Sequence, residues 1–176
     1  KVLNDGRQAI VLIPEIALTY QTVMRFYTRF GERVSILNSR MSQGERYDQM
    51  ERVKKGEVDI MIGPRSALFT PFEKPGLIVI DEEHEPTYKS EQVPRFHARE
   101  TAIERARMEG ASVVLGSATP SLEAFYACEC GRYQMLRLKM RTRKQELPQV
   151  YVADMREELK HGNRSILSDR LEELMQ

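Results

Sequence analysis

Two adjacent acids, Asp81 and Glu82, directly follow an unbroken apolar run at residues 77–80. Such a run is typical of a strand that is buried on both faces of a parallel sheet. Open α/β sheets bind ligands at the carboxyl ends of their strands, where one carboxylate can hold Mg²⁺ and the next can orient and deprotonate an attacking water. The pair therefore predicts a nucleotide-hydrolysing site in which Asp81 holds the metal through water. Taken alone, residues 81–84 (DEEH) could equally be a solvated loop or a helix cap.

Three further polar segments follow predicted strands: residues 14–15 (PE), 63–66 (GPRS) and 116–119 (GSAT). Each has a simpler explanation by itself, because proline and glycine stop strands while serine and threonine cap helices. In a parallel sheet, however, the carboxyl ends of all strands lie along one edge. The four segments together therefore favour one shared site over four unrelated turns.

Apolar runs and helical spacings alternate along the chain, which predicts an α/β fold: a mostly parallel sheet with helices on both faces. The predicted strands are residues 8–13, 33–37, 58–62, 77–80, 112–115 and 133–138. The predicted helices are residues 16–30, 42–55, 96–109 and a short helix from Ser121, the second of them opened by a capping box of Ser42 and Glu45. A further strand at residues 150–153 is expected to begin a second domain. The boundary is expected near residues 141–148, which gives domains at 1–143 and 144–176.

The composition limits the class of protein. The 176 residues carry a net charge of only +1 although 30% are charged, so contact with a polyanion must come from local patches. Two cysteines, Cys128 and Cys130, are too few for a disulfide framework and indicate a reducing compartment. No apolar run is long enough to span a bilayer, and the first residues lack the pattern of a secretory signal. We therefore expect a cytoplasmic protein with no membrane contact.

Four segments in this order resemble the successive motifs of DExH-type DNA helicases of superfamily 2, and in particular the replication-restart helicases among them. The segments are residues 13–21 (IPEIALTYQ), 63–71 (GPRSALFTP), 78–84 (IVIDEEH) and 116–123 (GSATPSLE). Residues 88–100 (YKSEQVPRFHARE) resemble the stretch between the last two motifs in those proteins. The resemblance implies an incomplete first RecA-like lobe followed by the start of a second. It also implies an ATP-dependent 3′-to-5′ DNA translocase that remodels stalled forks and helps to load the replicative helicase.

The resemblance assigns roles to individual residues. Asp81 matches the acid that coordinates Mg²⁺, Glu82 matches the residue that activates the hydrolytic water, and Glu83 and His84 match the sensing end of the box near the γ-phosphate. The segment that couples ATP state to DNA grip is matched by Ser117, Ala118 and Thr119. The residues that match segments lying along single-stranded DNA are Pro14, Glu15, Thr19, Arg65 and Ser66.

The loop at residues 85–95 has the composition of a single-strand contact. Tyr88 could stack on a base, which can contribute about 1–3 kcal/mol, while Lys89 and Arg95 could hold phosphates. Phe96, by contrast, is expected to pack against the core at the start of the next helix. The basic residues at 137–144 could touch DNA phosphates, but a solvated linker between domains is the simpler expectation.

The sequence departs from the family pattern at two loop positions, Tyr20 and Pro64, and it contains no G-x-x-x-x-G-K-[ST] phosphate loop. We expect that the chain is part of a longer enzyme and that, as written, it does not hydrolyse ATP. Mg²⁺ and ATP are the implied cofactors, and Zn²⁺ is expected only in the part of the full-length protein beyond this chain. The implied partners are single-stranded and forked DNA, the primosome and single-strand-binding proteins.

A second class of function fits the same residues. A non-catalytic module that binds nucleic acid or a partner protein could keep the RecA-like scaffold without the phosphate loop. The sequence upstream of Lys1 in the gene separates the two readings, because a Gly-Lys-Thr loop there would establish the enzyme.

Overall fold

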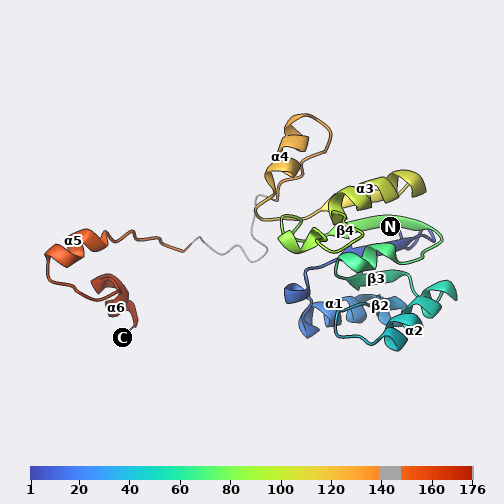
Figure 1. The fold of residues 1–176 in the computed structure, drawn as a ribbon, viewed down its shortest axis with the longest axis horizontal. Coiled ribbons are helices and arrows are strands. Elements are labelled where there is room, and N and C mark those ends of the chain that lie inside the picture. Colours follow the sequence, from blue (N-terminus) through green and yellow to red (C-terminus); the bar gives the residue numbers. More distant parts are fainter. Residues whose placement is uncertain (139–147, 176) are drawn as a thin grey trace. The chain divides into compact units, whose positions relative to one another are not determined.

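The computed structural model describes residues 1–138 and 148–175 of the chain (Figure 1). The chain divides into two compact units, Lys1–Gln134 and Met135–Gln176. The candidate site residues named above all lie in the first unit. The predicted boundary near residues 141–148 falls almost wholly outside the described residues, as do four members of the basic run: Lys139, Arg141, Arg143 and Lys144.

The first unit is built on a five-stranded parallel sheet in the order β2-β3-β1-β4-β5. Its strands are β1 (Gln8–Leu12), β2 (Val34–Ile36), β3 (Ile60–Gly63), β4 (Pro75–Ile80) and β5 (Ser112–Leu115). Val79 of β4 lies between Val11 of β1 and Val114 of β5, which fixes the register around the central strand. The predicted α/β fold with a parallel sheet is confirmed.

Helices and single turns connect the strands. The α-helices of this unit are α1 (Tyr20–Phe30), α2 (Gln43–Lys54), α3 (Ala98–Glu109) and α4 (Leu122–Glu129). The 3-10 turns are η1 (Glu15–Ala17), η2 (Gly31–Arg33), η3 (Arg65–Phe69) and η4 (Pro86–Tyr88). The predicted capping box opens α2, since Glu45 N donates to Ser42 Oγ and the Glu45 carboxylate accepts from Ser42 N.

Two apolar cores lie on opposite faces of the sheet. Because alternate residues of a strand face opposite ways, Ile10 and Leu12 enter one core while Ala9 and Val11 enter the other. The first core is closed by Val53 of α2, by three alanines of α3 and by Leu68, and the second is closed by three aromatic residues of α1. Helices therefore cover both faces, as predicted, and hold the carboxyl ends of the strands in place.

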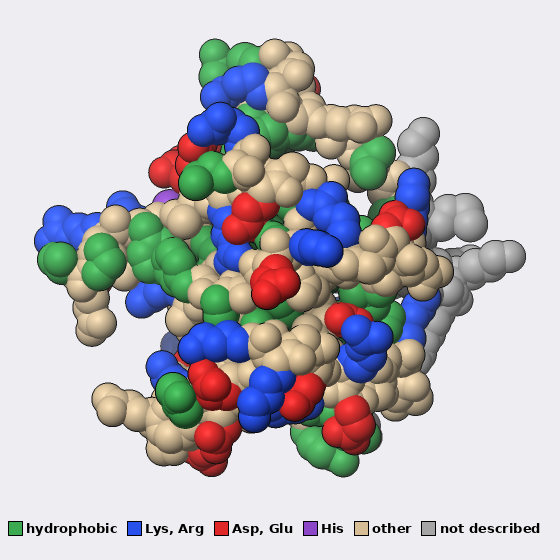
Figure 2. All heavy atoms as spheres, turned by 90° about the vertical axis from the view of Figure 1, so that its right-hand side faces the viewer, with side chains coloured by type: hydrophobic (Ala, Val, Ile, Leu, Met, Phe, Trp, Pro, Cys, Tyr) green, Lys and Arg blue, Asp and Glu red, His purple; other side chains and the backbone are tan. Residues whose placement is uncertain are grey.

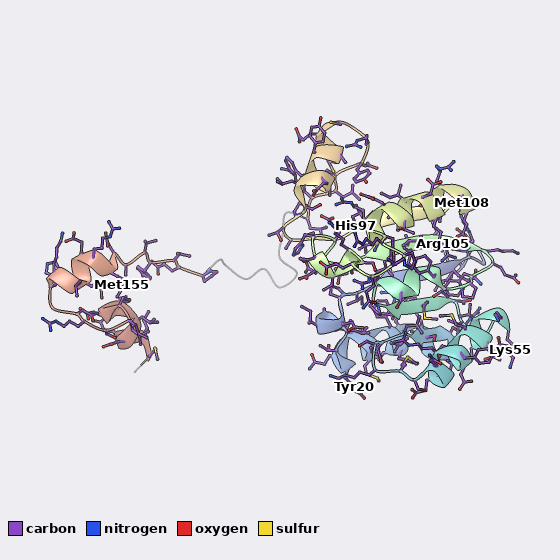
Figure 3. The ribbon with its side chains drawn as sticks, viewed as in Figure 1. Tyr20, Lys55, His97, Arg105, Met108 and Met155 are labelled. Atoms are coloured by element: carbon purple, nitrogen blue, oxygen red, sulfur yellow. The ribbon has the colours of Figure 1, made fainter. Side chains whose placement is uncertain are left out.

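The amino ends of the strands form a surface of mixed charge. Lys55 and Met108 precede β3 and β5 in the chain and lie on the right-hand side of Figure 3. Figure 2 views that side, and acidic and basic side chains are interspersed on it. This mixture agrees with the small net charge of +1.

Three strand predictions need correction. Residues 112–115 form β5 as predicted, but β5 lies at the edge of the sheet and is not a fully buried strand, since Val114 is 48% exposed. The described residues of 133–138 and 150–153 contain no strand. Most apolar side chains of both stretches are exposed, and Leu138 is 99% exposed, so neither stretch packs its apolar residues as a buried strand would.

The described part of the second unit is helical at two places. Helix α5 (Met155–Lys160) begins at Asp154, whose side chain accepts from Arg156 N, and α6 (Asp169–Met175) follows a short connection. Glu158 ties the two together, because its carboxylate accepts from Asn163 Nδ2 at 2.7 Å and from Asp169 N at 2.8 Å. Within the part of the chain that the structure describes, no helix combines the length and apolar character needed to cross a membrane.

Candidate functional site

The segments after β4 and β5 lie side by side at the carboxyl edge of the sheet. Gly116 N donates to Ile80 O at 2.8 Å, and Glu83 N donates back to Gly116 O at 2.9 Å. Residues 81–84 and 116–119 are thus joined through their backbones, although more than thirty residues separate them in sequence. This is the adjacency that the sequence predicted for the acid pair and the GSAT segment.

Asp81 has a fixed backbone and an exposed carboxylate. Asp81 N donates to Leu12 O at 2.9 Å, and Asp81 O accepts from the Tyr88 hydroxyl at 2.7 Å. The carboxylate accepts a bond from Glu82 N at 3.2 Å, and among the described residues it takes part in no ion pair. A Cβ atom on Gly116 would lie 3.5 Å from Asp81 Oδ1, so that strand end closes against one side of the carboxylate.

Glu82 adopts an uncommon backbone conformation, with φ at 47°. A non-glycine residue in this left-handed region costs about 1–3 kcal/mol, and such residues gather at functional sites. The Glu82 side chain is 42% exposed, and its Oε2 lies 3.6 Å from His84 Nδ1, a contact that is an ion pair only when the imidazole is protonated. The turn therefore presents the Glu82 carboxylate to solvent beside Asp81.

His84 links the acid segment to the GSAT segment through side chains. His84 Nδ1 and Ser117 Oγ are 2.8 Å apart, and Ser117 Oγ also accepts from Thr119 N at 3.0 Å. The direction of the histidine bond depends on the imidazole tautomer. Ala118 and Thr119 are exposed. The structure thus brings His84 together with two of the three residues predicted to couple nucleotide state to DNA.

Glu83 is buried, unlike its two acidic neighbours. Its side chain is 1% exposed. Oε1 accepts from Ser121 N at 2.6 Å, while Oε2 accepts from Ser121 Oγ at 3.0 Å and from Arg99 Nη1 at 3.2 Å. A carboxylate enclosed in this way cannot contact a nucleotide phosphate, which corrects the predicted catalytic place of Glu83.

Sequence reasoning missed Arg99 and placed Ser121 only at the start of a short helix. Ser121 is the N-cap of α4, and its hydroxyl accepts from Ala124 N at 3.2 Å. Arg99 lies in the first turn of α3 and is 7% exposed. A lone arginine within a charged helix gives no sequence signal of burial, whereas a buried Glu83 directly after β4 implies that a cation must lie nearby.

Tyr88 is buried, which corrects its predicted role in base stacking. The side chain is 1% exposed, and its hydroxyl donates a hydrogen bond to the carbonyl of Asp81. Burial raises the pKa of the Tyr88 phenol well above its ordinary value, and the negative charges of Asp81 and Glu85 raise it further. Tyr88 therefore supports the turn that carries the acid pair.

Arg65 joins the GPRS segment to the loop after the acid segment. Its Nη1 donates to Thr87 O at 2.7 Å and to Lys89 O at 3.0 Å. A hollow of about 350 Å³ adjoins these contacts, lined by Arg65, Pro86, Thr87, Lys89, Glu91 and Gln92. The guanidinium is half-buried, so part of its predicted contact surface is already occupied by the protein itself.

The other residues predicted to lie along single-stranded DNA differ in exposure. Glu15, Ser66, Lys89 and Arg95 are exposed at this edge of the sheet. Thr19 is also exposed and caps α1, where its Oγ1 accepts from Thr22 N at 3.3 Å. The Pro14 side chain, unlike these, is buried.

The loop between η4 and α3 is closed at its base. Lys89 and His97 form an isolated antiparallel bridge, and Ser90 N donates to Phe96 O at 2.8 Å. Phe96 packs edge-on against Phe69, which is itself 56% exposed, so it lies at the surface and not in the core as expected. His97, visible in Figure 3 at the start of α3, accepts from Arg99 N through Nδ1 at 3.2 Å. Burial lowers the pKa of this imidazole, and the Arg99 charge lowers it further.

The donor set at the acid pair fits Mg²⁺ better than a metal held wholly by protein. In residues 1–138 and 148–175, no three His, Cys, Asp or Glu side chains gather into a cage. Mg²⁺ is commonly held by one or two carboxylates with waters and substrate phosphates, and the exposed Asp81 carboxylate suits that arrangement. Cys128 and Cys130 are free thiols.

Comparison with known proteins agrees with this geometry. The family model described as DEAD/DEAH box helicase matches residues 1–126. The chain is 50% identical over its whole length to the replication restart protein PriA of Bacillus subtilis, and it spans 22% of that protein. It is 45% identical over 97% of its length to PriA of Synechocystis sp., of which it spans 21%, and 40% identical over 97% to PriA of Haemophilus influenzae, of which it spans 24%.

A structural neighbour supports the fold alone. The C-terminal domain of S. cerevisiae Dbp5 superposes with a TM-score of 0.50 at 15% identity, over 78% of this chain and 79% of that one. The predicted resemblance to replication-restart helicases is confirmed by the sequence relatives. The chain spans less than a quarter of the length of the curated relatives it matches.

Proposed function

This chain belongs to the DEAD/DEAH box helicase family, and we propose that it is part of the motor of an ATP-dependent, 3′-to-5′ DNA helicase that acts in replication restart. The names of its relatives support the restart role. The single observation that carries the proposal is the junction of residues 81–84 with residues 116–119, in which the backbone bonds at Gly116 and the 2.8 Å contact of His84 with Ser117 bring two separate motifs together.

In this proposal the two exposed acids do the chemistry. Asp81 would hold Mg²⁺, and the bound ion would neutralise charge on the phosphates of ATP. Glu82 orients the attacking water and accepts its proton. Because His84 touches both segments, it is placed to pass a change at the acid pair to Ser117 and onward to Thr119.

Single-stranded and forked DNA are the proposed nucleic-acid partners. The residues proposed to contact this DNA follow the carboxyl ends of β1, β3 and β4 in the chain. They are the exposed residues Glu15, Ser66, Lys89 and Arg95 and the partly exposed Arg65. The primosome and single-strand-binding proteins are the proposed protein partners. Free cysteines agree with the proposed cytoplasmic location, since reducing compartments keep thiols reduced.

The 176 residues alone are proposed to be inactive in ATP hydrolysis. They contain no G-x-x-x-x-G-K-[ST] sequence whose backbone N–H groups and lysine would cradle the phosphates. A non-catalytic module that binds nucleic acid is the second candidate, and this same absence favours it. A phosphate loop encoded directly before Lys1 in the gene would decide for the motor.

The test is Glu82→Gln in a full-length protein that carries this segment. We expect DNA-stimulated ATP hydrolysis to fall at least about 100-fold, the scale on which general base catalysis operates, while nucleotide binding stays within about twofold. Glu85→Gln is the matched control, because it makes the same chemical change three residues away. Retained turnover in Glu82→Gln would remove that residue from the proposed role.

A further inference from the structure

One buried ionic cluster joins three segments that are distant in the sequence. Glu83 belongs to the turn after β4, Arg99 to the first turn of α3, and Ser121 to the start of α4. The side chains of Glu83 and Arg99 are 1% and 9% exposed. The proposed chemistry uses none of these three groups, although Glu83 directly follows Glu82.

The polar groups of the cluster are all hydrogen-bonded. The carboxylate of Glu83 accepts three bonds, and Arg99 Nη1 donates at 2.7 Å to Ser121 Oγ as well as to Glu83. The Ser121 hydroxyl donates to Glu83 and accepts from Arg99 and from Ala124 N. Among the described residues no buried side-chain nitrogen or oxygen lacks a hydrogen-bond partner.

Such a cluster contributes more to position than to stability. A buried ion pair seldom stabilises a fold more than well-packed apolar side chains of the same volume would. Its bonds are directional, however, and a fully satisfied network of this kind permits one arrangement of the segments that carry it. The arrangement it fixes here is that of the acid turn relative to the segment after β5.

The cluster also touches the proposed DNA-binding loop. Arg99 follows the base of that loop by two residues, and its backbone N–H donates to His97 Nδ1 at 3.2 Å. His97 in turn bridges to Lys89, while Ser121 follows Thr119 by two residues. The base of the loop is therefore connected through the Arg99 backbone to the residue whose side chain holds Glu83 and Ser121.

We propose that Glu83, Arg99 and Ser121 are positioning residues that hold residues 116–119 against Asp81 and Glu82 and connect them to the loop at residues 89–97. The inference rests on the proposed function. In it, DNA engaged by the loop acts on the hydrolytic acids through the Arg99 guanidinium, and the contact of His84 with Ser117 is a second, shorter connection between the same two segments.

The first experiment needs no enzymatic activity. Hydrogen exchange is measured on this 176-residue chain for Glu83→Gln, for Ser121→Ala and for the wild type. We expect amides of residues 116–121 and 89–97 to exchange at least about tenfold faster in both variants, and by a clearly larger factor than the amides of β1, because the directional bonds of the cluster act on those two segments. Unchanged exchange in both segments overturns the proposal whatever the enzyme does.

Two matched variants separate this cluster from generic effects. Glu104→Gln removes the acid of an exposed pair on the same helix, in which Arg107 Nη2 lies 2.6 Å from Glu104 Oε1, and should change neither segment. Ser121→Thr keeps the hydroxyl and should restore the exchange pattern lost in Ser121→Ala. If Ser121→Thr behaves like Ser121→Ala, the hydroxyl is not the positioning group and the proposal fails.

The second experiment measures ATP hydrolysis with and without single-stranded DNA in a full-length protein that carries the segment. We expect Glu83→Gln and Arg99→Met each to reduce the ratio of stimulated to basal rate at least about fivefold, and the double variant to do no worse than the more affected single one, since both remove one contact. The proposal is contradicted if the ratio of stimulated to basal rate is unchanged in the single variants. It is also contradicted if the loss in the double variant equals the product of the two single losses. A wild type without any DNA-stimulated hydrolysis contradicts the proposed function instead, and the exchange measurement then still decides the cluster.

Discussion

The two halves of the segment at residues 81–84 have opposite environments. Asp81 and Glu82 present carboxylates to solvent, whereas Glu83 is enclosed and His84 is held by Ser117. Glu82 and Glu83 are the same residue type in adjacent positions, yet one is placed for chemistry and the other for anchoring. Residue type alone therefore does not determine the role of an acid in such a segment. Its burial and the hydrogen-bond donors around it determine that role.

The largest expected effect falls on the anchored half. Arg99→Met leaves the Glu83 carboxylate buried without its cation, which should lower the free energy of unfolding of the 176-residue chain by about 3–5 kcal/mol. Urea unfolding followed by circular dichroism measures the change. Arg107→Met, in the exposed pair of the same helix, should leave the unfolding midpoint where it is, and an equal loss in both variants would erase the distinction between the halves.

The exposed half should respond in the opposite way. Asp81→Asn removes the charge that would hold Mg²⁺, so ATP hydrolysis in a full-length protein should fall at least about 100-fold. The stability of the 176-residue chain should change by less than about 0.5 kcal/mol, as expected for an exposed side chain outside any ion pair. A marked loss of stability with retained hydrolysis would reverse the assignment of the two halves.

The third prediction concerns the hydrogen bond from the Tyr88 hydroxyl to the turn that carries Asp81 and Glu82. Tyr88→Phe removes the bond to the Asp81 carbonyl and should destabilise the chain by about 1 kcal/mol at neutral pH. Because the pKa of Tyr88 is raised in the folded state, its contribution is present below the ordinary tyrosine pKa of 10.0 and is lost as the pH rises above it. The difference between variant and wild type should therefore shrink in urea titrations at about pH 11. A constant difference would mean that the phenol is not buried.

The smallest effect concerns single-stranded DNA. Lys89→Ala removes an exposed cation and should reduce the slope of log affinity against log salt by about 0.7, the value for one phosphate contact on a single strand. Arg65→Ala should reduce it by less, because that guanidinium is already engaged by Thr87 O and Lys89 O. Fluorescence anisotropy across a salt series compares the two, and a steeper change for Arg65→Ala would show that its cation faces DNA after all.

The sequence predicted the sheet well because its signals are local. Buried strands such as β1 and β4 are apolar runs, and the cap of α2 depends on residues only three positions apart. The same logic placed residues 81–84 beside residues 116–119, since parallel strands end at one edge. The wrong strands at 133–138 and 150–153 had suitable residues but lacked a partner, which no local pattern can reveal.

The site was harder to predict where it depends on distant contacts. The burial of Glu83 requires Arg99 and Ser121 to approach from two other elements, and the burial of Tyr88 requires the turn of η4 to fold back under Asp81. The motif indicated which segments matter. It did not distinguish a carboxylate that reacts from one that is tied, because that distinction is set by solvent access.

The left-handed backbone of Glu82 sets up a conflict between durability and activity. Glycine adopts φ near 47° without steric cost, so Glu82→Gly should relieve part of the strain and make the folded chain more resistant to heat while discarding the carboxylate. Selection for thermal robustness alone would push this position toward glycine, and only a demand for the acid holds it at glutamate. A library of variants can be screened first for melting temperature and then for ATP hydrolysis. Position 82 should be among those at which a higher melting temperature is accompanied by the largest loss of hydrolysis.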